Sequence, residues 1–176
     1  IRDIAEQLGK HPVDTLLDLA CADDLATVFF SVSPTNTQGG YREVMTDPSV
    51  LPGVSDGGAH VRFLTAGRYP TETIIRAARE GDVMSLEDVH AKLSAMPAYV
   101  AGYRDQGTIE VGKAADIVVY DFENLAVLPV EKLVDQPGGE WRRVQRAKGY
   151  RFILVNGEVT IEEDRELGRY PGQMLR

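Results

Sequence analysis

The sequence predicts an α/β fold, with part of an α/β layer or barrel over residues 1–104 and a smaller β-rich domain over residues 105–176. Three observations predict it. Amphipathic helical segments alternate with short apolar runs in the first part of the chain. Strand-forming residues dominate from about Gly107 onward. The length of 176 residues suffices for one domain or two small ones.

Apolar residues at helical spacing predict a first helix over residues 1–8, which Gly9 ends. Pro12 suits the first turn of a second helix, which the Cys21–Asp24 stretch ends. Residues 26–32 are β-branched and aromatic, and this composition predicts a buried strand.

A short helix over Gln38–Met45 is predicted next, capped from within residues 33–37. The apolar run Val50–Val54 predicts a second strand, and this strand leads directly to an acidic glycine turn. A further helix is predicted over Thr71–Glu80, with Gly81 as its stop.

The last helix of the first part begins at Ser85–Asp88, which resembles a capping box, and is predicted to end near Pro97. The next strands are predicted over Gly107–Gly112 (with a turn), Ala115–Asp121, Tyr150–Val155 and Glu158–Ile161. Asn156–Gly157 joins the last two as a hairpin. Between these strands, we expect a helical turn over Pro129–Asp135 and an exposed loop over Gln136–Glu140.

Composition narrows the classes of partner. The formal net charge is −8, and an acidic surface repels phosphate backbones and anionic lipid, so we expect no nucleic-acid or membrane partner. The single cysteine, Cys21, excludes an intrachain disulfide and a cysteine-based zinc cluster. The chain starts without Met and without a signal-peptide pattern, which is typical of an internal part of a longer protein. We expect a cytoplasmic location.

Asp56 is the first candidate for chemistry. An acid on a glycine turn after an apolar run is how many barrel enzymes present a catalytic or metal-binding carboxylate. Such a carboxylate could ligate a divalent metal and exchange a proton with water. Gly57 and Gly58 would let a substrate approach the backbone closely. The alternative is a plain surface turn, because Asp and Gly dominate turns.

The neighbours of Asp56 are further candidates for binding substrate. His60 could contact substrate, donate a hydrogen bond to a residue that binds the metal or substrate, or be a structural side chain bonded to a loop carbonyl. Arg62 and Arg68 could hold a substrate carboxylate, or could be solvated surface residues. His11 and His90 are predicted to face solvent, and the three scattered histidines form no metal-binding motif.

Four stretches together carry a family resemblance, and the resemblance covers essentially the whole chain. They are Ser55–His60, Ser94–Ala98 followed by Gly102, Gly107–Asp121 and Val155–Val159, with Gly168–Arg176 as a tail. In combination they resemble the C-terminal part of the metal-dependent amidohydrolase superfamily, in the branch of the D-aminoacylases (N-acyl-D-amino-acid deacylases).

The resemblance implies the C-terminal portion of a (β/α)8 (TIM) barrel and most of a small β-sandwich-like domain. It implies one or two divalent metals, usually zinc, with Asp56 as the acid on the final barrel strand and as a metal ligand. Asp56 would take a proton from the attacking water and deliver it to the departing amine. The substrate would be a small-molecule amide, such as an N-acyl amino acid.

This chain also departs from the family pattern. It contains no His-x-His pair, and Gly67–Pro70 replaces the His-Pro-Arg-like segment of the D-aminoacylases. We therefore expect a fragment of a metal-dependent amidohydrolase that is inactive and binds no metal alone. Two alternatives remain: a chain completed in trans by a partner that carries the histidines, such as the N-terminal remainder of the enzyme, or a self-associating, non-catalytic binding module.

Overall fold

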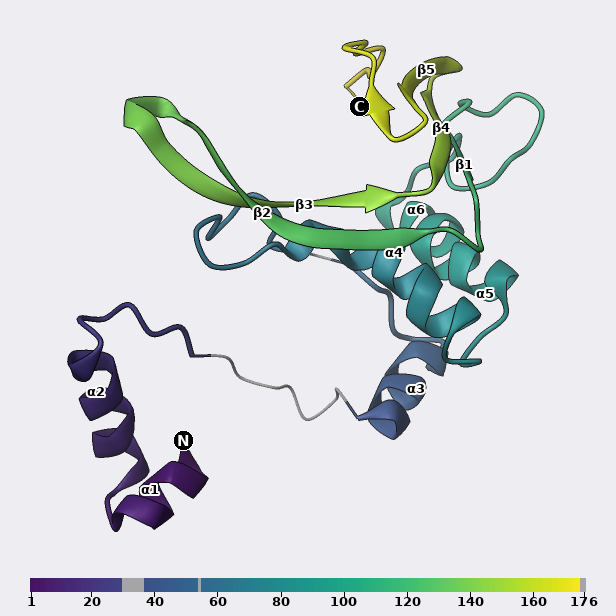
Figure 1. Cartoon of the computed structure of the whole chain (residues 1–176). Helices are drawn as coiled ribbons and strands as arrows, with labels where there is room; N and C mark the ends of the chain where they lie inside the picture. Colours follow the sequence, from purple (N-terminus) through teal and green to yellow (C-terminus); the bar gives the residue numbers. More distant parts are fainter. Residues whose placement is uncertain (30–36, 54, 175–176) are drawn as a thin grey trace. The chain divides into compact units, whose positions relative to one another are not determined.

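The computed structural model describes residues 1–29, 37–53 and 55–174 and divides the chain into two compact units, Ile1–Asn36 and Thr37–Arg176 (Figure 1). The first unit contains two helices, α1 (Arg2–Leu8) and α2 (Pro12–Ala22). Both were predicted, and their ends follow from local signals. Gly9 closes α1 at φ 61°. The His11 ring accepts the amide of Val13 and so caps α2.

Among the described residues, the second unit begins with six α- and π-helical segments. They are α3 (Gln38–Thr46), α4 (Tyr69–Thr73), the π-helical η3 (Ile74–Arg79), α5 (Leu86–His90), the π-helical η4 (Ala91–Ala95) and α6 (Met96–Ala101). The predicted capping box is confirmed, because Ser85 Oγ accepts the amide of Asp88 at 3.1 Å. A 3₁₀ turn, η2 (Ala66–Arg68), precedes α4.

The prediction that this last helix ends near Pro97 was wrong. The helix continues to Ala101 and ends at Gly102, which has φ 81°. Proline lacks an amide hydrogen and collides with the carbonyl four residues earlier in a regular α-helix. The π-helical turn at Ala91–Ala95 widens the backbone just before Pro97, and we attribute the continuation to this turn.

The two strands predicted in the first part of the chain are not observed where the structure describes it. Residues 26–29 and 50–53 are not in strands, while residues 30–32 and Val54 lie outside the described residues. A strand needs a hydrogen-bonded neighbour, and neither run has one among the described residues. Local β-propensity alone therefore overestimated the strand content here.

The β-rich part contains two antiparallel sheets. One has the order β1 (Ile117–Tyr120), β4 (Tyr150–Val155), β5 (Glu158–Glu162) and β6 (Arg165–Glu166). The other is the long hairpin β2 (Ala126–Gln136) and β3 (Glu140–Lys148). The predicted Asn156–Gly157 turn is confirmed, with φ 49° and 79°, the sign that a type I′ hairpin turn requires. Mixed helices and sheets agree with the α/β class.

Two predictions in this part were wrong. Pro129–Asp135 is part of strand β2 rather than a helical turn. Pro129 is tolerated because the β2–β3 register shifts between Val127 and Val130. Gly107–Gly112 forms turns and no strand. Its first glycine has φ 91°, and a Cβ there would lie 2.5 Å from the Cβ of Ala98, so the close approach of α6 requires glycine.

The core of the second unit joins the helices to the β-rich part. Its buried residues are Met45, Ile74, Ala77, Val83, Val89 and Leu125. Leu125 lies just before β2, while the others lie in or next to the helices. Arg79 adds polar contacts, since its guanidinium donates to the carbonyls of Phe122, Glu123 and Leu125. This core therefore joins helices α3, η3, α5 and η4 to the part of the β-rich region formed by β1, the start of β4 and the residues before β2.

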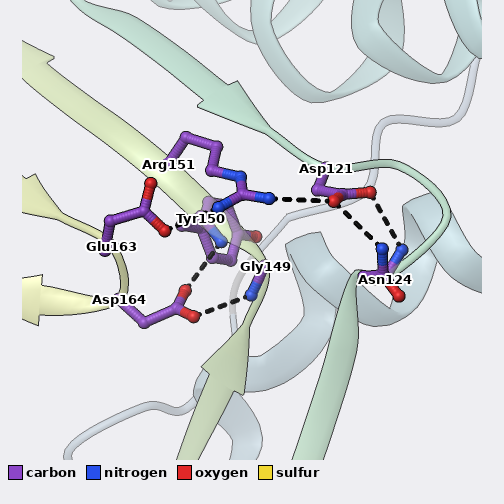
Figure 2. A network of polar contacts seen from close by, with 7 residues as sticks. All are labelled: Asp121, Asn124, Gly149, Tyr150, Arg151, Glu163 and Asp164. Atoms are coloured by element: carbon purple, nitrogen blue, oxygen red, sulfur yellow. Dashed lines mark hydrogen bonds and ion pairs between the residues drawn. The ribbon is translucent and has the colours of Figure 1, made fainter.

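Two acids of the Gly107–Asp121 motif hold the small sheet together. Asp116 accepts the amide of Asn156 at 2.8 Å, at the tip of the β4–β5 hairpin. Asp121 accepts two hydrogen bonds from Asn124 and pairs with Arg151, which also pairs with Glu163 (Figure 2). These motif acids have structural contacts in the sheet.

The hydrogen bonds of Asp121, and those that Arg142 donates to Asp135, predict a dependence of stability on pH. Hydrogen bonds from Asn124 hold the pKa of Asp121 below its usual range, and Arg142 lowers the pKa of Asp135 in the same way. A lowered folded-state pKa stabilises the fold above the unfolded-state pKa, and this stability is lost as pH falls through the folded-state pKa. We therefore expect the melting temperature to decrease as the pH is lowered below about 4.

Thermal unfolding followed by circular dichroism between pH 7 and pH 2 tests this expectation. Asp121→Asn and Asp135→Asn should each flatten the acid limb of the curve. A melting temperature that rises on acidification from pH 4 would contradict it.

Candidate functional site

The Asp56 turn is an exposed, tightly closed loop. Asp56 has φ 51°, its carbonyl accepts the amide of Ala59 at 3.0 Å, and its side chain is exposed. Ser55 Oγ accepts the amide of Gly57 at 3.0 Å. The turn therefore presents the Asp56 carboxylate to solvent, where a ligand can reach it.

The two positions of the turn favour glycine for different physical reasons. Gly58 has φ 93°, a backbone conformation that residues other than glycine rarely adopt. At Gly57, a Cβ would lie 2.8 Å from Ser55 Oγ, which caps the turn. The shape of the turn accounts for both residues, and a role in admitting substrate stays a prediction.

His60 begins a second turn directly after the first. Its carbonyl accepts the amides of Phe63 and Leu64 at 3.0 and 3.2 Å, and its own φ is 51°. The imidazole ring is exposed, with its centroid 5.0 Å from that of Phe63. His60 is thus available at the surface, and its contact with substrate stays a prediction.

Both arginine candidates are exposed and contact other parts of the same unit. Arg62 forms an ion pair with Glu140 and lies 5.5 Å from the centroid of the Trp141 ring. Arg68 pairs with Glu72 at 2.9 Å and donates to Gln145. A substrate carboxylate would compete with these acids. The binding role of both residues stays a prediction.

Lys92 is a residue that the sequence reasoning missed. Its side chain is only 5% exposed, and its ammonium group donates to the carbonyls of Asp47 at 2.5 Å and Val50 at 2.7 Å. It therefore holds the turn from which the chain runs toward Asp56. Its spacing of three residues from the buried Val89 places it on the inner face of the helix, and this spacing could have revealed it.

His90 was also predicted incorrectly. It is half-buried, and its Nε2 lies 2.7 Å from the hydroxyl of Tyr120. Both residues line a cavity of about 750 Å³ between the helices and strands β1 and β4. Burial raises the pKa of the Tyr120 hydroxyl above its usual range.

The described residues do not fit a metal site by themselves. Among residues 1–29, 37–53 and 55–174, no group of three or more His, Cys, Asp or Glu side chains is placed to hold an ion. Asp56 could supply one carboxylate ligand, whereas a structural or catalytic zinc needs three or four protein ligands. The described part of the chain also contains no helix long and apolar enough to cross a membrane.

Comparison with known proteins defines the class of the protein. Residues 1–161 match the amidohydrolase family, so the chain belongs to this family. The chain is 32% identical over 106 residues to N-acyl-D-glutamate deacylase from Alcaligenes xylosoxydans xylosoxydans, a match that covers 60% of the chain and 20% of the relative. These matches confirm the resemblance to the D-aminoacylase-like branch.

Uncharacterised proteins of Mycobacterium bovis and Mycobacterium tuberculosis are 26% identical over 164 residues, covering 90% of the chain and 25% of each relative. The chain thus spans between a fifth and a quarter of the length of these curated relatives. No solved structure matches the chain significantly.

Proposed function

We propose that this chain is the C-terminal part of a metal-dependent hydrolase that cleaves the amide bond of an N-acyl amino acid. The observation that carries the proposal is the exposed Asp56 carboxylate on its double-glycine turn, in a chain that matches the amidohydrolase family over residues 1–161. The similarity to an N-acyl-D-glutamate deacylase supports an N-acyl-D-amino acid as the substrate.

Asp56 acts as general base and then as general acid in this proposal. Its carboxylate accepts a proton from the water that attacks the amide carbonyl, and returns it to the nitrogen of the departing amine. A divalent metal, which the family generally uses and which we propose to be zinc, would polarise the carbonyl. Because the described residues supply too few ligands, its remaining ligands would come from outside this sequence.

The proposed architecture follows from the family. Residues 1–104 would form the last strands and helices of a (β/α)8 barrel, and residues 105–176 most of a small β-domain. The four-stranded sheet β1-β4-β5-β6 supports the second assignment. The two strands expected before Asp56 would find their hydrogen-bonded neighbours only in the complete barrel. We also propose a cytoplasmic location.

Exposed apolar side chains favour a partner for the first unit. On α1 and α2, Ile4, Leu8, Val13 and Leu17 are all exposed. Large apolar surfaces usually mark contacts with other protein. These residues support either the remainder of the enzyme, in cis or in trans, or a self-associating module as the second candidate.

An assay of the protein produced from its complete natural gene tests the proposal. We expect hydrolysis of N-acetylated amino acids, offered as separate D and L enantiomers, that stops after chelation and returns with zinc. The 176-residue chain alone should be inactive. If the metal-loaded protein hydrolyses none of these substrates, the proposed function is rejected. If the isolated chain shows zinc-dependent activity, the proposal that it is only part of the enzyme is rejected.

A further inference from the structure

The segment that follows the Asp56 turn packs against the β2–β3 hairpin. Figure 1 shows this hairpin running along the chain that leads into α4. Glu140 pairs with Arg62, and Gln145 Oε1 accepts the hydroxyl of Thr65 at 2.7 Å. These contacts join parts of the chain that are nearly 80 residues apart, so they form only in the folded unit.

Arg143 makes the most direct contact with the backbone of this segment. Its amide donates to the carbonyl of Val61 at 2.7 Å, and its side-chain Nε donates to the carbonyl of Arg62 at 2.8 Å. A single residue of β3 therefore holds two successive carbonyls. The bond from Nε is charge-assisted, which makes it stronger than a neutral hydrogen bond.

The two carbonyls belong to the turn that abuts the Asp56 turn. The first turn is closed between Asp56 and Ala59, and the second between His60 and Phe63, each at 3.0 Å. Since the peptide bond is planar, only the soft backbone dihedrals at the Ala59–His60 junction lie between them. Holding the second turn therefore restricts the position of the Asp56 backbone, from which the carboxylate projects.

We propose that Arg143 is a positioning residue that fixes the Asp56 turn against the β2–β3 hairpin; its catalytic consequence rests on the function proposed above. Arg143 itself touches backbone carbonyls and acts only through the turn. The neighbouring Arg142 provides a contrast, because it pairs with Asp135 across the same hairpin.

The test compares Arg143→Lys and Arg143→Ala with the control Arg142→Lys. Both lysine variants keep the charge, but Arg143→Lys removes the Nε donor to the Arg62 carbonyl. In the 176-residue chain, millisecond hydrogen–deuterium exchange of peptides covering residues 57–64 should become about tenfold faster in the Arg143 variants, the loss expected for one charge-assisted hydrogen bond. Arg142→Lys should leave it unchanged, and exchange at β4–β5 reports that all variants are folded.

The catalytic readout uses the protein from the complete gene. There, Arg143→Lys should lower kcat about tenfold or more with little change in KM, since misplacing a catalytic group affects the transition state. Unchanged exchange over residues 57–64, or equal effects of both lysine variants, would overturn the proposal. Faster exchange with an unchanged kcat would overturn its catalytic part. If the unsubstituted protein hydrolyses no N-acyl amino acid, the proposed function fails, and the exchange result alone decides whether Arg143 holds the turn.

Discussion

Asp56→Asn is expected to lower kcat for amide hydrolysis by about 10³-fold in the protein from the complete gene, because general acid–base catalysis typically contributes 10²–10⁴-fold. Asparagine has nearly the same size and also tolerates a positive φ, so the turn at φ 51° should keep its shape. The amide group, however, cannot accept a proton from water at neutral pH. The effect should therefore fall on kcat far more than on KM.

Asp24→Asn is the matched control for this substitution. Asp24 is also exposed and has a positive φ of 47°, in a turn after α2. Its substitution should leave kcat unchanged within the error of the assay. An Asp56→Asn enzyme with more than about a tenth of the original kcat would contradict a role in general acid–base catalysis.

Leu125→Ala is expected to destabilise the second unit by about 2–5 kcal/mol, the usual cost of removing a buried leucine side chain. Leu125 is 1% exposed and packs among Ile74, Ala77 and Val89 of the helices. The site cannot easily collapse around the cavity, because Arg79 holds the Leu125 carbonyl at 2.6 Å. The backbone of Gly149 also approaches so closely that a Cβ there would lie 3.0 Å from the Leu125 Cα.

Urea unfolding followed by circular dichroism measures this loss of stability. Leu167→Ala removes the same atoms from a side chain that is 37% exposed and should cost less than about 1 kcal/mol. Similar losses for both variants would show that Leu125 does not join the helices to the β-rich part.

The predictable parts of the fold are those specified by local signals. The end of α1 at Gly9, the start of α2 at Pro12 and the Asn156–Gly157 hairpin each depend on backbone conformations that a few neighbouring residues determine. The errors in the strands occurred where distant partners decide. Residues 129–135 form a strand because β3 pairs with them, whereas residues 50–53 form none and have no such neighbour in the part of the chain that the structure describes.

The candidate site was likewise predictable where local residues specify the structure and not where distant contacts do. The Asp56 turn was predictable, because an acid followed by two glycines specifies a turn by itself. Lys92 and Arg143 support the segment around it through contacts with carbonyls 42 to 81 residues away. A backbone carbonyl has no signature in the sequence. Residues that bind carbonyls over such distances are therefore recognised only in the folded structure.

The most direct test of the central claim is a crystal structure of the protein from the complete gene, with diffraction recorded at the zinc absorption edge. We predict an anomalous peak about 2.0–2.2 Å from a carboxylate oxygen of Asp56, the distance usual for zinc and a carboxylate ligand. A metal held entirely by other residues, with the Asp56 turn remote from it on the surface, would contradict the claim that Asp56 belongs to the active site.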